Sequence, residues 1–149
     1  MKKLSSVFYM IIGLVLGLLA VLMELVPFAS YDSGTVVAAR HLFWGIGTEG
    51  GAWPAFVGYM LILLGSLMMG FMALPFIQPS IKTEKIVLIS AAALILVGLI
   101  LACLITVEYP SLGGTYYGIF DYFLAGFYLT IVFSLGAIAM DIIALRLDW

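Results

Sequence analysis

The chain has 149 residues, of which 65% are hydrophobic and 9% are charged, and its formal net charge is −2. Soluble domains average roughly 45–50% apolar and 25% charged residues, so the composition excludes an ordinary soluble protein. The small negative charge offers no basic face, and we expect no nucleic-acid partner. The sequence therefore predicts a single all-α integral membrane domain.

Four apolar runs are long enough to cross a bilayer as helices, for which about 20 residues are needed. In chain order, the predicted transmembrane helices cover about 5–27, 54–77, 86–107 and 120–145. A long outer loop at 28–53, a short cytoplasmic loop at 78–85 and a second outer loop at 108–119 connect them. Because backbone groups in lipid must be satisfied within the segment, we predict a four-helix antiparallel bundle and no barrel.

The first run has the basic start of a secretory signal. Its apolar stretch is longer than the usual 7–15 residues, and Pro27 and Phe28 stand where a cleavage site needs small residues. We therefore interpret the first run as a retained transmembrane helix.

Basic residues predict the orientation. Five of the six Lys and Arg residues fall on one side of the predicted spans: Lys2, Lys3, Lys82, Lys85 and Arg146. Arg40 alone falls on the other side. Since cytoplasmic loops carry the excess of Lys and Arg, both termini are predicted to be cytoplasmic. The short loops and tails favour the plasma membrane of a prokaryote.

Small residues recur along the runs at helix-packing spacing, and such positions let helix backbones approach closely in lipid. The positions expected to pack helices are Gly13, Gly17, Gly58, Gly65, Gly70, Gly98 and Gly126. Packing within the four helices is the simplest interpretation. The alternative is that the Gly13/Gly17 stripe faces another protein.

Acidic residues lie near the predicted helix ends. Glu24, Glu108 and Asp121 fall at similar depth near the outer surface, where they either form an outward vestibule that binds cations or are simply solvated helix ends. Asp141 lies about one turn from Arg146, and we expect it to pair locally or to extend toward the cytoplasmic interface.

The outer loops carry the candidate recognition residues. These are Asp32, Arg40, His41, Phe43, Trp44, Trp53, Tyr116 and Tyr117. The segment 35–45 is predicted to be amphipathic and to lie on the outer leaflet. An alternative pairs His41 with Asp32, Glu49 or Glu24 as an acid/base unit.

Catalytic signatures are missing from the sequence. It has no zinc-protease, nucleophile-elbow or phosphate-loop motif. Its one cysteine, Cys103, and one histidine, His41, provide no disulfide and no thiolate or bis-histidine metal centre. We therefore predict no catalytic residue, no metal and no cofactor.

The Phe43-Trp44-Gly45 stretch in a long first outer loop, together with four spans and cytoplasmic ends, resembles the claudin-like four-helix membrane proteins. That family carries two cysteines in this loop, whereas this loop has none. The resemblance implies a role in adhesion or lateral assembly, and no functional residue is transferred from it.

These patterns favour a non-enzymatic membrane subunit that assembles with itself or with a larger membrane complex. Its expected partners are membrane lipids and membrane proteins. The first alternative is a small transporter or channel with the acidic outward vestibule. The second is an outer-leaflet enzyme that acts on lipid or quinone through His41.

Overall fold

The computed structural model describes residues 4–31, 34–37, 53–103 and 125–147. Their elements are helix α1 (Leu4–Leu22), a 3-10 turn (Met23–Leu25), strands β1 (Pro27–Tyr31) and β2 (Gly34–Val37), and helices α2 (Trp53–Ala73), α3 (Ile81–Cys103) and α5 (Ala125–Leu147). Helices α1 (extended by the 3-10 turn), α2, α3 and α5 are each long and apolar enough to cross a membrane. The chain is thus a multi-pass membrane protein.

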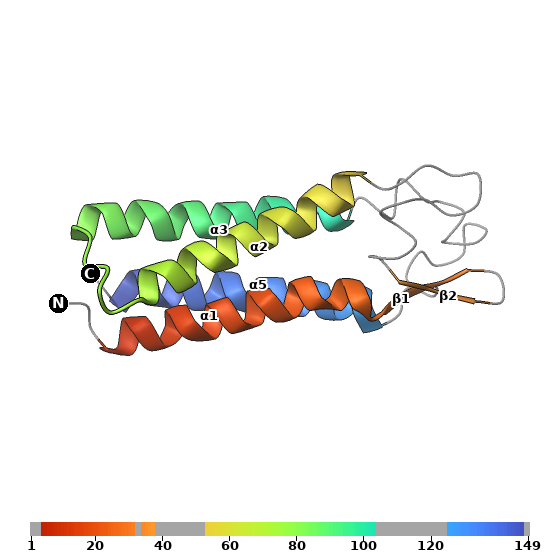
Figure 1. Ribbon diagram of the computed structural model, residues 1–149, viewed down its shortest axis with the longest axis horizontal. Helices are drawn as coiled ribbons and strands as arrows, with labels where there is room; N and C mark the ends of the chain where they lie inside the picture. The colour runs from red at the N-terminus through yellow and green to blue at the C-terminus, as the bar shows by residue number, and fades with distance from the viewer. Residues whose placement is uncertain (1–3, 32–33, 38–52, 104–124, 148–149) are drawn as a thin grey trace.

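The four helices lie side by side (Figure 1). Helix α2 packs most extensively against α3 and helix α1 against α5, while α1–α2 and α3–α5 contacts join the two pairs. The start of α1, the α2–α3 connection and the end of α5 lie at one end of the molecule, and the β hairpin lies at the other (Figure 1).

The α2–α3 connection begins and ends earlier than predicted. Helix α2 ends at Ala73, just before Pro75, and α3 begins at Ile81. Proline cannot continue a helix, and the chain turns there through a hydrogen bond from Leu74 N to Phe71 O (3.2 Å). Ser80 then caps α3, since its Oγ accepts a hydrogen bond from Thr83 N at 3.2 Å. The connection therefore covers 74–80 rather than 78–85.

A two-stranded antiparallel hairpin follows α1, in a region treated only as a loop in the sequence analysis. Tyr31 pairs with Gly34 and Ala29 with Val36, and the register is irregular between Pro27 and Ala29. Residues 35–37 of the segment expected on the outer leaflet belong to strand β2. The remainder of that segment lies outside the described residues.

Glycines set the closest approaches between helices. A Cβ built on Gly58 of α2 would lie 2.7 Å from the backbone nitrogen of Ala102 in α3, and one on Gly98 would lie 3.0 Å from the backbone nitrogen of Ile62. Gly13 and Gly17 of α1 are buried, and a Cβ there would collide with Met69 and Ser66 of α2. Because α2 of the same chain covers the Gly13/Gly17 stripe, that stripe does not face another protein.

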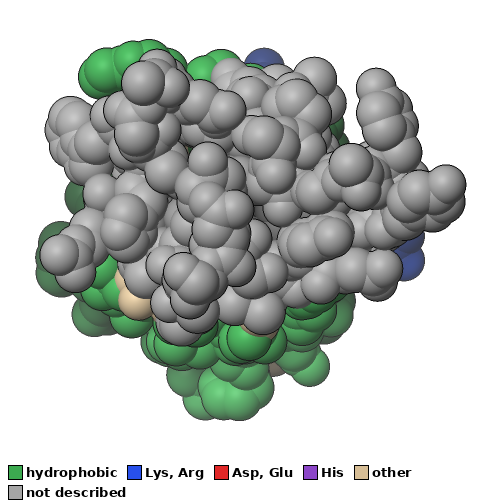
Figure 2. Space-filling model, turned by 90° about the vertical axis from the view of Figure 1, so that its right-hand side faces the viewer, with side chains coloured by type: hydrophobic (Ala, Val, Ile, Leu, Met, Phe, Trp, Pro, Cys, Tyr) green, Lys and Arg blue, Asp and Glu red, His purple; other side chains and the backbone are tan. Residues whose placement is uncertain are grey.

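The outer surfaces of the helices are apolar. Large hydrophobic side chains are exposed on all four helices, among them Phe8, Leu64, Ile89 and Val132. Seen from the end that carries the hairpin, the side chains of the described residues around the rim are mainly hydrophobic (Figure 2). An apolar outer surface of this kind is suited to contact with lipid tails.

Candidate functional site

Six polar or charged side chains are buried among the described helices. They are Ser6, Ser66, Glu84, Thr130, Ser134 and Asp141. Ser66 donates to the carbonyl oxygen of Ile62 at 2.7 Å, and Ser6 donates to that of Ala144 at 3.5 Å. A buried hydroxyl in lipid needs such a partner because no water can replace it. The polar interior is therefore partly satisfied by hydrogen bonds to the backbone.

Tyr59 and Thr130 join α2 to α5. Their hydroxyl oxygens lie 2.9 Å apart, and Thr130 Oγ1 also donates to the carbonyl oxygen of Gly126 at 2.8 Å. The single hydroxyl hydrogen of Thr130 is used by Gly126, so Tyr59 is the donor in the Tyr59–Thr130 bond. Both residues are buried, and their bond ties two helices that otherwise make few contacts.

Removing the Tyr59 hydroxyl is expected to weaken this tie. Tyr59→Phe should lower the free energy of unfolding by about 0.6 kcal/mol, the average for a hydrogen bond between membrane helices. The measurement is reversible unfolding in mixed micelles of mild detergent and SDS, followed by tryptophan fluorescence. Thr130→Ser keeps the hydroxyl and serves as the control. A double-mutant cycle of Tyr59→Phe with Thr130→Val that shows no coupling would contradict the prediction.

Asp141 is the most unusual of the buried polar residues. It lies on α5, six residues before Leu147, which places it about 9 Å from the end of that helix. Its side chain is 1% exposed, and it lines a cavity of about 190 Å³ between α3 and α5. The other lining residues are Leu88, Ile89, Ala92, Ile142 and Leu145. We call this cavity the α3–α5 groove, because its rim residues Ile89 and Ile142 are exposed on the lipid-facing surface.

The carboxylate of Asp141 has one backbone neighbour, but no hydrogen bond of good geometry, within the described part of the chain. The peptide group of Ala92, the central residue of α3, lies beside it. Neither carboxylate oxygen, however, makes a hydrogen bond among the described residues. A charged group at such depth in a membrane is unfavourable unless it is paired, and ionisable residues inside spans commonly mark functional sites.

This position corrects the expectation that Asp141 pairs with Arg146 or extends to the interface. Five residues along a helix correspond to a rotation of about 140°, so the two side chains leave α5 on different faces. Arg146 is exposed, whereas Asp141 is buried against α3.

The packing positions of α5 form a stripe that extends to Asp141. The small and polar residues Gly126, Thr130 and Ser134 follow one another at intervals of four. Continuing by three and four residues reaches Ala137 and then Asp141, and all five are buried. Residues at such intervals share one helix face, so this pattern predicts an inward Asp141.

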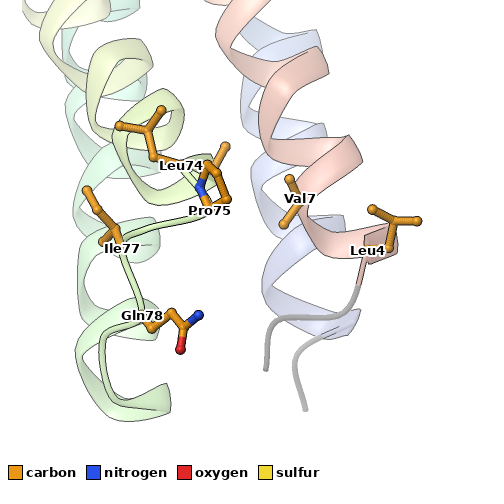
Figure 3. A pocket seen from close by; sticks show the side chains of 7 residues that line it. Leu4, Val7, Leu74, Pro75, Ile77 and Gln78 are labelled. Atoms are coloured by element: carbon orange, nitrogen blue, oxygen red, sulfur yellow. The ribbon is translucent and has the colours of Figure 1, made fainter.

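A second cavity, of about 360 Å³, lies at the other side of the same end of the molecule. Leu4 and Val7 line it from the start of α1, and the end of α2 and the following connection contribute Ala73, Leu74, Pro75, Ile77 and Gln78 (Figure 3). Gln78 is the only polar side chain among its lining residues. None of the described residues that line it is charged, and they give this cavity a mainly hydrophobic surface.

The predicted acidic and recognition residues are described only in part. Glu24 lies in the 3-10 turn after α1 and is half-buried. Trp53 begins α2, is exposed, and packs edge-on against Phe56 with ring centroids 6.0 Å apart. The other predicted members of these two sets lie outside the described residues: Asp32, Arg40, His41, Phe43, Trp44, Glu108, Tyr116, Tyr117 and Asp121. The outward vestibule therefore stays a prediction.

All of the glycines that the sequence predicts to pack helices lie within the described residues. A Cβ on Gly65 would lie 2.8 Å from the carbonyl oxygen of Ala91, and one on Gly70 would lie 2.7 Å from a methyl of Leu14. Gly126 is buried and accepts the Thr130 hydrogen bond. Among the described residues, no three His, Cys, Asp or Glu side chains gather in a way that could hold a metal ion.

No protein-family model matches the sequence, and no curated protein or solved structure is significantly similar to it.

Proposed function

We propose that this protein is a non-enzymatic subunit of a larger membrane complex. The observation that carries the proposal is Asp141, which lines a groove on the lipid-facing side while its carboxylate oxygens stay buried beneath the groove without a hydrogen-bond partner among the described residues. The small residues that could have joined another chain are used between the helices of this one. Ser134 Oγ also lacks a hydrogen-bond partner in the described part of the chain, but of the two residues only Asp141 lines the groove, so we place the contact with a partner there.

A larger complex fits this feature better than a homo-oligomer. Two copies related by a two-fold axis through the groove would place one Asp141 against the other, and the pair could persist only if one carboxyl group took up a proton. The basic residues Lys82 and Lys85 lie in the first two turns of α3, and Arg146 lies in the last turn of α5. In the described part of the chain, none of the three lies at the depth of Asp141.

The proposal includes an orientation with both termini in the cytoplasm of a prokaryotic cell, in its plasma membrane. It is supported by the excess of basic residues at the end of the molecule where α1 starts and α5 ends. In that orientation Asp141 lies in the cytoplasmic half of the membrane, and the β hairpin lies outside.

Isolation of the intact complex tests the proposal. Native mass spectrometry of the protein, extracted from its own membrane in mild detergent, is expected to give a complex with a second membrane protein at fixed stoichiometry. Masses that are only multiples of the 16.2 kDa chain, with bound lipid, would contradict it.

A small transporter is the second candidate, favoured by the polar groups along the interior face of α5. Thr130, Ser134 and Asp141 lie on that face, and the Tyr59 hydroxyl reaches it from α2. Such a series could pass protons or small cations. In that case the purified chain alone should conduct ions in liposomes, and Asp141→Asn should stop the flux. Absence of flux in the wild-type chain would dispose of this candidate.

A further inference from the structure

We propose that the α3–α5 groove receives a transmembrane helix of another protein, and that a Lys or Arg of that helix pairs with Asp141. The inference rests on the proposed function and names the chemistry of the partner.

The α3–α5 groove opens on the lipid-facing surface, where a transmembrane helix of another protein can reach it. Its rim residues Ile89 and Ile142 are 56% and 45% exposed on the outer surface of the helices. Leu88, Ala92 and Leu145 complete the apolar lining. The small side chain of Ala92 lets a neighbouring backbone approach closely, as small residues do between membrane helices.

Charge complementarity identifies the occupant. Asp141 is 1% exposed, and neither of its carboxylate oxygens has a hydrogen-bond partner among the described residues. Asp141 lies about 9 Å inside the end of α5, beside Leu88 and Ala92 of α3. A headgroup cation of a lipid stays near the interface, whereas a Lys or Arg within a helix can be held at this depth. A basic helix from another protein therefore fits better than a lipid.

The carboxylate oxygens are covered by the chain's own atoms before the partner arrives. Pairing therefore requires a rotation of the Asp141 side chain toward the groove, with movement of the exposed Ile142 at the rim. Exposed side chains change rotamer readily, so the groove can open without displacement of the helices.

The test uses the full-length protein in phosphatidylcholine liposomes, with a donor fluorophore on its single cysteine, Cys103. The probes are two synthetic leucine-alanine transmembrane peptides that carry an acceptor and differ only at the central residue, Lys or Leu. Energy transfer is expected to show about tenfold tighter association of the Lys peptide, the effect of one good polar contact between membrane helices. Asp141→Asn should remove the preference, and Ser134→Ala, on the same face of α5, should keep it.

Three outcomes would overturn the inference: equal binding of both peptides to the wild-type protein, a Lys preference that persists in Asp141→Asn, or energy transfer between two labelled copies of the chain that the Lys peptide cannot displace. Circular dichroism and the unfolding midpoint establish that each variant is folded. The two proposals fail separately. A native partner that binds Asp141→Asn as well as wild type refutes the basic helix alone, whereas Lys-peptide binding with no native partner refutes the subunit role alone.

Discussion

Asp141→Leu is expected to raise the free energy of unfolding of the isolated protein by about 2 kcal/mol. A buried polar group without a hydrogen-bond partner destabilises a protein by about this amount. A leucine side chain is similar in width to that of aspartate but carries no carboxylate, and it fills part of the adjoining 190 Å³ cavity. Replacement of poorly compensated buried charges by apolar residues is often stabilising. Unfolding in mixed micelles of mild detergent and SDS, followed by tryptophan fluorescence, measures the change.

Asp141→Asn separates charge from shape in this experiment. Asparagine has nearly the same size but stays polar, so it should stabilise the protein less than leucine does. Ile142→Leu, on the exposed rim of the groove, is the matched control and should change little. If Asp141→Leu instead destabilised the isolated chain by a similar amount, the carboxylate would have to make a stabilising contact within this chain. Combined with the peptide experiment, a gain in stability with a loss of binding would identify Asp141 as a residue retained for association.

Gly58→Ala is expected to lower the free energy of unfolding by about 3 kcal/mol, at the upper end of the usual cost of overpacking. The added methyl would collide with the carbonyl oxygen of Gly98 and lie 2.7 Å from the backbone nitrogen of Ala102. Both atoms belong to the backbone of α3, so neither can move aside by a change of rotamer. Separation of α2 from α3 is the remaining way to admit the methyl group.

Gly136→Ala is the matched control for this substitution. It is also a glycine-to-alanine change within a helix, so the helix-propensity term is the same. Its nearest neighbour is the terminal methyl of Leu16, at 3.1 Å, which belongs to a flexible side chain. The control should retain or slightly increase stability. Equal losses in the two variants would show that the Gly58–Gly98 approach is not the critical contact.

The four long apolar runs predict the four helices, because only lipid accommodates segments so apolar and so long. The helix boundaries were less accurate at the α2–α3 connection, where the local chemistry of Pro75 and Ser80 outweighs the apolar pattern that continues past Ala73. The hairpin was missed because its strands are only five and four residues long and stand next to a much stronger helical signal.

The candidate site was harder to predict than the fold. In the sequence, the short distances from Asp141 to the helix end and to Arg146 both indicate an interfacial residue. Burial depends instead on which neighbour its helix face meets, and Leu88 and Ala92 come from a helix some fifty residues earlier. The stripe from Gly126 to Asp141 indicates the inward face, but the missing hydrogen-bond partner is visible only once α3 is in place.

The pairing of α1 with α5 also has a consequence for biosynthesis. The first helix to enter the membrane finds its most extensive neighbour only when the last helix has been made, since α5 contacts α1 and α3 and supplies the acceptor for Ser6. Until then, the three inserted helices leave uncovered the faces of α1 and α3 that α5 covers in the finished protein. Nascent chains that end before Ala125 therefore expose these two helix faces to the surrounding bilayer.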